Sequence, residues 1–160
     1  MIVSNATPLI YLGKTGYLFL LKKLFGKVLI VKEVYEEILK QKNSKEAILL
    51  KESIKEGWVI IEYAKAKREF EKYSWIDIGE LNSISLAKDK NLLILIDDET
   101  AKQIAGINKV KAHGTLFVLK LAYNKKLIAK DETVNILNNM LDCGFYLSGK
   151  MYSDFVNSLD

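Results

Sequence analysis

The stretch from Leu92 to Asp98 constrains the fold of this chain more than any other feature. Five consecutive apolar residues, Leu92 to Ile96, are followed at once by Asp97 and Asp98. A short unbroken apolar run is typical of a strand that is buried on both faces of a parallel sheet. Open α/β sheets bind ligands and metals at the carboxyl ends of their strands, where these two acids would lie. We therefore expect a site at that edge if other polar groups converge there.

Strand-like and helix-like segments alternate along the chain. We expect strands at residues 2–4, 27–31, 57–62, 92–96 and 109–112. We expect helices at residues 8–17, 18–25, 33–40, 44–55, 77–88, 99–105, 116–123, 132–141 and 149–159, and an exposed helix or loop at 64–73. This alternation predicts a three-layer α/β/α sandwich with a mostly parallel sheet. A length of 160 residues without a visible boundary fits a single domain, 1–160.

Composition limits the partners and the cellular compartment that we expect for this chain. The net charge of +4 permits an anionic partner such as RNA but does not require one. The apolar runs are shorter than the roughly 18 to 20 residues of a membrane span, and no basic leader precedes the first strand. A single cysteine, Cys143, suits a reducing compartment. We expect a cytoplasmic protein with no membrane partner.

Asp97 and Asp98 have two interpretations. Asp98 could cap the helix that follows it, which is a common role for an acid between a strand and a helix. Capping by Asp98 would leave Asp97 unexplained, because adjacent carboxylates repel each other when no cation lies between them. The alternative is that the pair belongs to a functional site.

The other candidate acids are also ambiguous. Asp77 and Glu80 have the spacing of a capping box, yet Glu80 also opens a helix whose apolar and small residues indicate burial. Glu36 and Glu37 fall on opposite flanks of the apolar arc of their helix, so periodicity cannot choose between them. A solvated helix face would explain both of these glutamates without a site.

Few other residues carry recognisable chemistry. Asn5 to Pro8 turns the chain after the first strand, and Thr7 before Pro8 is typical of a helix N-cap. His113 is the only histidine, which argues against a zinc site or a catalytic triad, and no glycine-rich phosphate loop occurs. Carboxylates without histidine are hard oxygen ligands that select Mg²⁺ or Mn²⁺, and such sites typically support phosphodiester cleavage.

Taken together, these segments resemble the PIN domain, in the branch near the ribonuclease toxins of toxin–antitoxin pairs. The resemblance runs nearly end to end and rests on residues 3–10, 34–38, 79–80, 86–87, 95–98, 114–116 and 144–148. It implies a metal-dependent nuclease in which acids from four places in the chain meet at the carboxyl edge of the sheet. The implied partners are RNA, possibly an antitoxin protein, and a second copy of the chain.

The resemblance assigns roles by position. The second acid of the family pattern falls on Glu37, and the third falls on Glu80, where many relatives have aspartate. The fourth falls on Asp98, with Asp97 beside it as an alternate or second ligand or as the general base. The implied metal ligands are therefore Glu37, Glu80 and Asp98, together with the residue at position 5.

The first position of the pattern departs from the family. Asn5 stands where the family has aspartate, and Thr7 and Thr115 are the implied supporting polar residues. An amide oxygen can ligate a hard cation but brings no negative charge, so we expect weaker metal binding. Two hypotheses follow: a metal-dependent endoribonuclease, and a catalytically weakened PIN-fold module that binds RNA or is regulated by a partner. A receiver-like domain would instead place its aspartate pair after the first strand.

Overall fold

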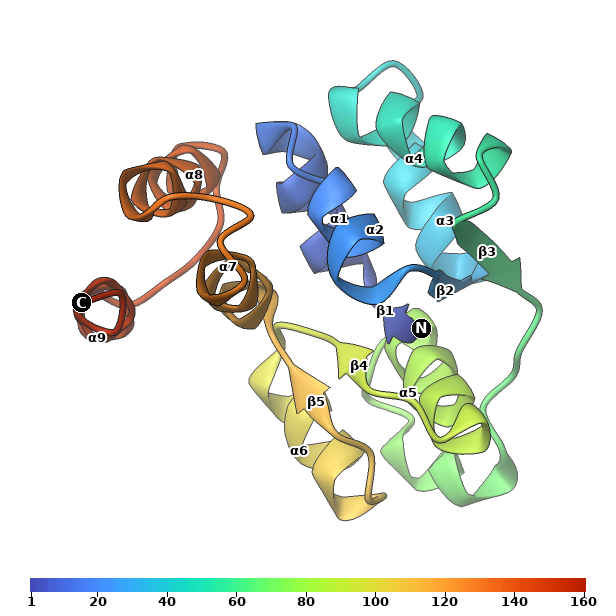
Figure 1. Cartoon of the computed structure of the whole chain (residues 1–160). Helices are drawn as coiled ribbons and strands as arrows, with labels where there is room; N and C mark the ends of the chain where they lie inside the picture. The colour runs from blue at the N-terminus through green and yellow to red at the C-terminus, as the bar shows by residue number, and fades with distance from the viewer.

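Five short strands form one all-parallel sheet at the centre of the molecule (Figure 1). The computed structural model describes residues 1–160. The strands are β1 (Ile2–Ser4), β2 (Val28–Val31), β3 (Val59–Glu62), β4 (Ile94–Leu95) and β5 (Ala112–His113). Their order across the sheet is β3-β2-β1-β4-β5, so β1 is the central strand. Every neighbouring pair is parallel, as the alternating sequence pattern predicted.

Helices cover both faces of the sheet, which confirms the three-layer sandwich. Figure 1 shows α5 and α6 on one face and α1, α4 and α7 on the other. The helices are α1 (Ala6–Thr15), α2 (Phe19–Phe25), α3 (Lys32–Ile38), α4 (Lys45–Lys55), α5 (Ile78–Lys90), α6 (Glu99–Ile107), α7 (Thr115–Asn124), α8 (Lys130–Asp142) and α9 (Gly149–Asn157), with short 3₁₀ turns η1 (Leu39–Gln41) and η2 (Arg68–Tyr73). None of the helices has the length and apolar content that crossing a bilayer would require.

The strand expected at residues 92–96 is shorter than predicted. Only Ile94 and Leu95 pair with both neighbouring strands, and Leu92 and Leu93 are half-buried. The reason is the length of the neighbours, because β1 has three residues and β5 has two. Burial was predicted correctly for the rest of the run, since the Ile94, Leu95 and Ile96 side chains are fully buried.

The N-cap predicted at Thr7 is wrong. Helix α1 begins at Ala6, and the capping position belongs to Asn5, whose backbone is extended (φ −79°, ψ 176°) and whose side chain makes no capping hydrogen bond. Pro8 is accommodated at the third helical position because the first-turn N–H groups have no partner within the helix. The side chain of Asn5 is therefore free to contact other parts of the chain.

The segment at residues 64–73 is less exposed than predicted. It contains η2, whose Phe70 and Tyr73 side chains are buried in the apolar core. The charged residues between them remain at the surface. Two buried aromatic rings therefore fasten an otherwise polar segment beside the start of α5.

Candidate functional site

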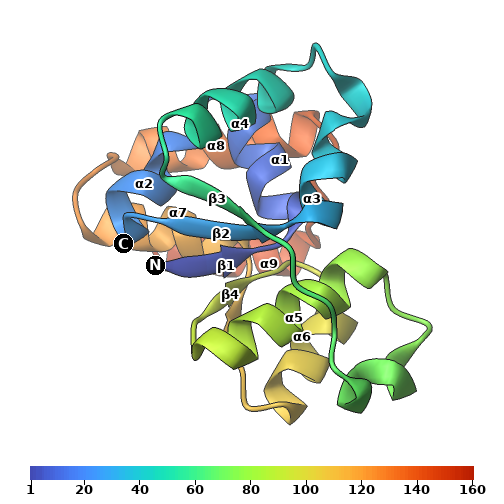
Figure 2. The ribbon, with the colours of Figure 1, turned by 90° about the vertical axis from the view of Figure 1, so that its right-hand side faces the viewer.

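The sheet has a topological switch point beside β1. From β1 the chain connects to β2 on one side, and β4 lies on the other side. Asn5 directly follows β1, and Asp97 and Asp98 follow β4. Figure 2 shows α3, which carries Glu37, next to the carboxyl ends of β2 and β3. In open α/β sheets this is the position at which ligands bind.

A pocket of about 500 Å³ opens at this edge, and we call it the acid pocket. It is lined by Asn5, Thr7, Glu33, Glu36, Glu37, Lys40, Asp77, Ile78 and Glu80. Four residues that the sequence analysis singled out, Asn5, Thr7, Glu37 and Glu80, thus share one pocket although they come from three separate stretches of the chain. Lys40 is the only cation in its lining.

Glu80 is the electrostatic centre of this pocket. Burial, together with the negative charges of Asp98, Asp77 and Glu37, raises the pKa of Glu80 to about 7. The Asn5 side-chain amide donates a long hydrogen bond of 3.3 Å to Glu80 Oε1, which only partly opposes this rise. At neutral pH the Glu80 carboxyl is therefore about half protonated, as expected for acids crowded without a cation.

The predicted capping box forms only in part. The Asp77 carboxylate accepts a hydrogen bond of 2.8 Å from the Gly79 N–H and so caps α5. The reciprocal contact is missing, because Glu80 turns toward Asn5. Glu80 is thus available to the acid pocket while Asp77 holds the end of its helix.

The structure separates the two neighbouring glutamates on α3. Glu36 forms an exposed ion pair of 3.1 Å with Lys32 on the same helix. Burial and the charge of Asp77 raise the pKa of Glu37, so the Glu37 carboxylate lies within the field of the acid cluster. Both glutamates line the acid pocket, so the assignment of Glu37 as the site residue stays a prediction.

Asp97 and Asp98 cap two different helices. The Asp98 carboxylate accepts a hydrogen bond of 2.7 Å from the Ala101 N–H at the start of α6. The Asp97 carboxylate accepts two hydrogen bonds from Thr115 at the start of α7, 2.8 Å from the N–H and 2.6 Å from Oγ1. Both adjacent acids thus have a structural role, but only Asp98 acts on the charge of Glu80.

Asp97 does not line the acid pocket; it lies instead at a second, smaller pocket of about 120 Å³ that also contains Lys102 and Gly114. Burial raises the pKa of Asp97, and the hydrogen bonds from Thr115 and the charge of Lys102 oppose that rise. A methyl group on Gly114 would lie 2.6 Å from Asp97 Oδ1, so no larger residue fits there without moving the carboxylate. Thr115, which the family pattern places near the site, supports Asp97 and does not line the acid pocket.

The donor set of the acid pocket fits a hard divalent cation. No three acidic side chains stand close enough together to make a preformed cage. Asp98 does not line the acid pocket, but its negative charge, like those of Asp77 and Glu37, raises the pKa of Glu80. Glu37 and Asp98 are both exposed, and the Asp98 carboxylate is held by its hydrogen bond from the Ala101 N–H.

Three lining residues were not foreseen as part of the site. Asp77 was considered only as a cap, and Lys40 and Glu33 were not singled out at all. Glu33 has a buried carboxylate oxygen, Oε2, without a hydrogen-bond partner. Glu33 and Lys40 flank Glu37 in the sequence, whereas Asp77 precedes α5. Only the packing of α3 against α5 brings these residues to one pocket, and the sequence alone does not show that packing.

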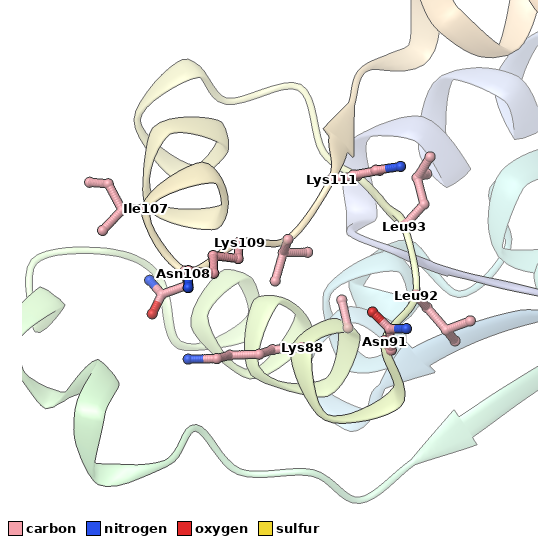
Figure 3. A pocket seen from close by; sticks show the side chains of 10 residues that line it. Lys88, Asn91, Leu92, Leu93, Ile107, Asn108, Lys109 and Lys111 are labelled. Atoms are coloured by element: carbon pink, nitrogen blue, oxygen red, sulfur yellow. The ribbon is translucent and has the colours of Figure 1, made fainter.

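The largest cavity lies at the opposite edge of the sheet (Figure 3). Its volume is about 620 Å³, and it is lined by Lys88, Lys109 and Lys111 with no carboxylate. The side chains of Lys88 and Lys111 extend in opposite directions in Figure 3, so they do not concentrate charge at one point. The acid pocket and this cavity are therefore separate features of opposite charge.

A comparison with protein-family models gives one match over the whole chain. A family model described as a PIN domain matches residues 1–160. Among solved structures, the chain is similar to a PilT N-terminus domain protein, SSO1118, from the hyperthermophilic archaeon Sulfolobus solfataricus P2. That similarity has 15% sequence identity and a TM-score of 0.47, and it covers 75% of this chain and 92% of the other. No curated protein matches the sequence.

Proposed function

The chain belongs to the PIN-domain family, and from that membership we propose that it is a metal-dependent endoribonuclease acting on single-stranded or looped RNA. PIN domains are generally nucleases that depend on divalent metals. The observation that carries the proposal for this chain is the acid cluster around Glu80. Carboxylates that raise one another's pKa at a sheet switch point are typical of a site that binds a cation.

Glu37, Glu80 and Asp98 are the proposed ligands of Mg²⁺ or Mn²⁺, with the Asn5 amide oxygen as a neutral fourth donor. When bound, such a cation stabilises the charge that develops on a phosphodiester and lowers the pKa of water. Glu80 would release its proton on cation binding, because a carboxylate must be ionised to act as a ligand. Lys40, the one cation in the lining of the acid pocket, is the proposed contact for a phosphate.

Asp97 is proposed as a positioning residue. Both of its oxygens accept hydrogen bonds from Thr115, so it fixes the start of α7 behind the site. A role for Asp97 as general base stays a prediction, but the hydrogen bonds to Thr115 leave its carboxylate less free to accept a proton from water.

The direct test is cleavage of a panel of single-stranded and hairpin RNAs by purified protein with Mn²⁺, with Mg²⁺ and with EDTA. We expect cleavage that requires metal and falls by roughly 100-fold or more in Glu80→Gln and in Asp98→Asn, because each removes a transition-state charge interaction. Glu36→Gln is the matched control, since Glu36 lines the same pocket but pairs with Lys32. Cleavage that persists with EDTA, or an equal loss in Glu36→Gln, would contradict the proposal.

Asn5 favours a second candidate, a PIN-fold module with weakened catalysis that binds RNA. Its amide nitrogen faces Glu80, so the residue adds a hydrogen-bond donor where the family pattern has a negative charge. This candidate predicts RNA binding without turnover in the wild type and cleavage restored by Asn5→Asp. Cleavage by the wild type at the level of Asn5→Asp would exclude it.

A toxin role is a more specific version of the endoribonuclease proposal. Ribonuclease toxins stop growth by cutting cellular RNA, so expression of the wild-type chain in bacteria should arrest growth. The same expression of Glu80→Gln should not, at matched protein levels. Normal growth with the wild type would contradict the toxin role without touching the nuclease proposal.

A further inference from the structure

We propose that two exposed aromatic residues beside the acid pocket, Tyr63 and Trp75, form a stacking platform for the bases of single-stranded RNA. This inference rests on the proposed function, because it names how the substrate of that site is held. Aromatic rings beside a basic surface are a common way to bind single strands without sequence preference.

Both aromatic residues lie at the same edge of the sheet as the acids. Tyr63 directly follows Glu62, which pairs with Val31 across β3 and β2, so Tyr63 leaves the sheet at the same edge as Lys32, the first residue of α3. Glu36, on the same helix, lines the acid pocket. Trp75 stands three residues before Ile78, which lines the pocket and is 57% exposed. The platform thus borders the pocket through α3 on one side and through the start of α5 on the other.

The exposure of these rings is unusual for their residue types. Tyr63 is 83% exposed and Trp75 is 70% exposed, whereas the second tryptophan, Trp58, is only 6% exposed. Large aromatic side chains are normally buried to a greater extent, so two exposed rings on elements that border one pocket are candidates for contact with a ligand.

Trp75 is held in place while exposed. Its ring packs edge-on against Tyr73, with the ring centroids 5.8 Å apart and an interplanar angle of 77°. Tyr73 is 7% exposed and Phe70 is fully buried. An exposed ring fixed by a buried neighbour loses little conformational freedom on binding, which favours a stacked base.

The charge of the surrounding segment suits an RNA strand. Lys65, Arg68 and Lys72 are exposed and form no ion pair. Lys67 and Glu69 are neutralised by ion pairs with Asp89 and Lys88, and Glu71 is the one acid of the segment without a cation.

The strip runs along α5, because Lys67 and Glu69 pair with Asp89 and Lys88 in the last turn of that helix, and its far end reaches Trp75, two residues before the pocket residue Asp77. Its cations would hold the phosphates of an RNA strand, which the carboxylates of the acid pocket repel. A protein partner is less well matched, because the surface is mainly basic and its apolar part is confined to a few side chains.

The test measures RNA binding in the background of Glu80→Gln, so that cleavage does not interfere. A labelled, unstructured RNA oligonucleotide is titrated in EDTA, and binding is followed by anisotropy and by quenching of tryptophan fluorescence. Because Trp58 is buried, the quenching reports on Trp75. We expect Trp75→Ala and Tyr63→Ala to weaken binding about 5- to 150-fold each, as expected for the loss of one stacked base.

Three controls make the result specific. Trp75→Phe keeps a flat ring and should retain most of the affinity. Phe19→Ala removes another exposed aromatic ring, away from the platform, and should bind like the background. Duplex RNA should bind more weakly than the single strand, because its bases are already stacked. Thermal melting of each variant verifies that the fold is kept.

Two results would overturn the platform: binding by the double Trp75→Ala and Tyr63→Ala variant within twofold of the background, or equal affinity for duplex and single strand. Failure of the proposed function would look different. A wild type that cuts no RNA while Trp75→Ala still loses binding would remove the nuclease and leave the platform. Normal cleavage with unchanged binding in Trp75→Ala would remove the platform alone.

Discussion

Two carboxylates at the same edge of the sheet, Asp97 and Glu80, have opposite surroundings. Asp97 accepts two hydrogen bonds from Thr115 and lies near the Lys102 cation. Glu80 has one long hydrogen bond from Asn5 and is otherwise surrounded by acids. The comparison teaches that an acid at a ligand-binding edge is not by itself a ligand: Asp97 is already satisfied, while Glu80 is short of positive charge.

The difference has an energetic consequence. Hydrogen bonds to a buried carboxylate stabilise the fold, and each contributes about 1.5 to 3 kcal/mol when a charged group is involved. Crowded acids do the reverse, because each raises the free energy of ionising its neighbours. We therefore expect changes around Asp97 to lower stability and changes around Glu80 to lower activity.

The largest effect on stability should come from Gly114→Ala. The added methyl group would lie 2.6 Å from Asp97 Oδ1, so the carboxylate must move and its hydrogen bonds to Thr115 weaken. We expect a loss of about 2 to 3 kcal/mol in the free energy of unfolding, measured by denaturant titration. Gly106→Ala is the control, because a methyl group there meets no atom within 4 Å. Equal stability of the two variants would show that the Asp97 contacts are not structural.

A smaller effect of opposite sign should come from Glu80→Gln. The pKa of Glu80 is about 7 in the folded chain against an ordinary value of 4.5, so the folded state binds more protons between these values. The free energy of unfolding of the wild type therefore falls as the pH rises from about 4.5 to 7. Above pH 7 it stays at this lower value, because Glu80 is then ionised in both the folded and the unfolded state.

Removing this ionisable group should stabilise the metal-free protein by about 1 to 2 kcal/mol at pH 8, a range that allows for solvent screening. Little gain is expected at pH 4, where the carboxyl is neutral in both states. Thermal melting in EDTA at the two pH values measures the difference, with Glu36→Gln as the matched variant. The same gain at both pH values would mean that charge crowding is not the cause.

The smallest effect should come from Asn5→Asp. The added charge replaces a hydrogen-bond donor to Glu80, so the metal-free protein should lose about 1 kcal/mol at pH 8. The same charge should tighten Mn²⁺ binding by roughly tenfold, because one more anionic ligand faces the cation. The increase in melting temperature on adding Mn²⁺ should thus be larger in Asn5→Asp than in the wild type. An unchanged increase would show that position 5 does not face the cation.

The sequence predicted the order of elements, and four of the nine residues that line the acid pocket were among its candidate site residues. The end of the first strand placed Asn5 at this edge, whereas Glu37 came from the family pattern alone, because periodicity could not choose between it and Glu36. The partner of Asp97 could not be predicted, since Thr115 lies 18 residues further along the chain and only the sheet brings them together.

Two other predictions failed because they also depend on contacts between distant parts of the chain. The failed capping box depends on Asn5, which contacts Glu80 across 75 residues. Phe70 and Tyr73 are buried because their segment packs against the core. The many charged residues of that segment had indicated an exposed helix or loop. Periodicity describes which face of an element is apolar, but not which distant group satisfies a polar side chain.

The most direct test of the account is calorimetric titration of Mn²⁺ into the wild type, Glu80→Gln and Thr115→Val at pH 7.5. The account predicts one Mn²⁺ site in the wild type, loss of that site in Glu80→Gln, and a retained site in Thr115→Val despite its lower stability. Mn²⁺ binding that survives in Glu80→Gln but disappears in a folded Thr115→Val would contradict it, because the cation would then belong to Asp97 and not to the acid pocket.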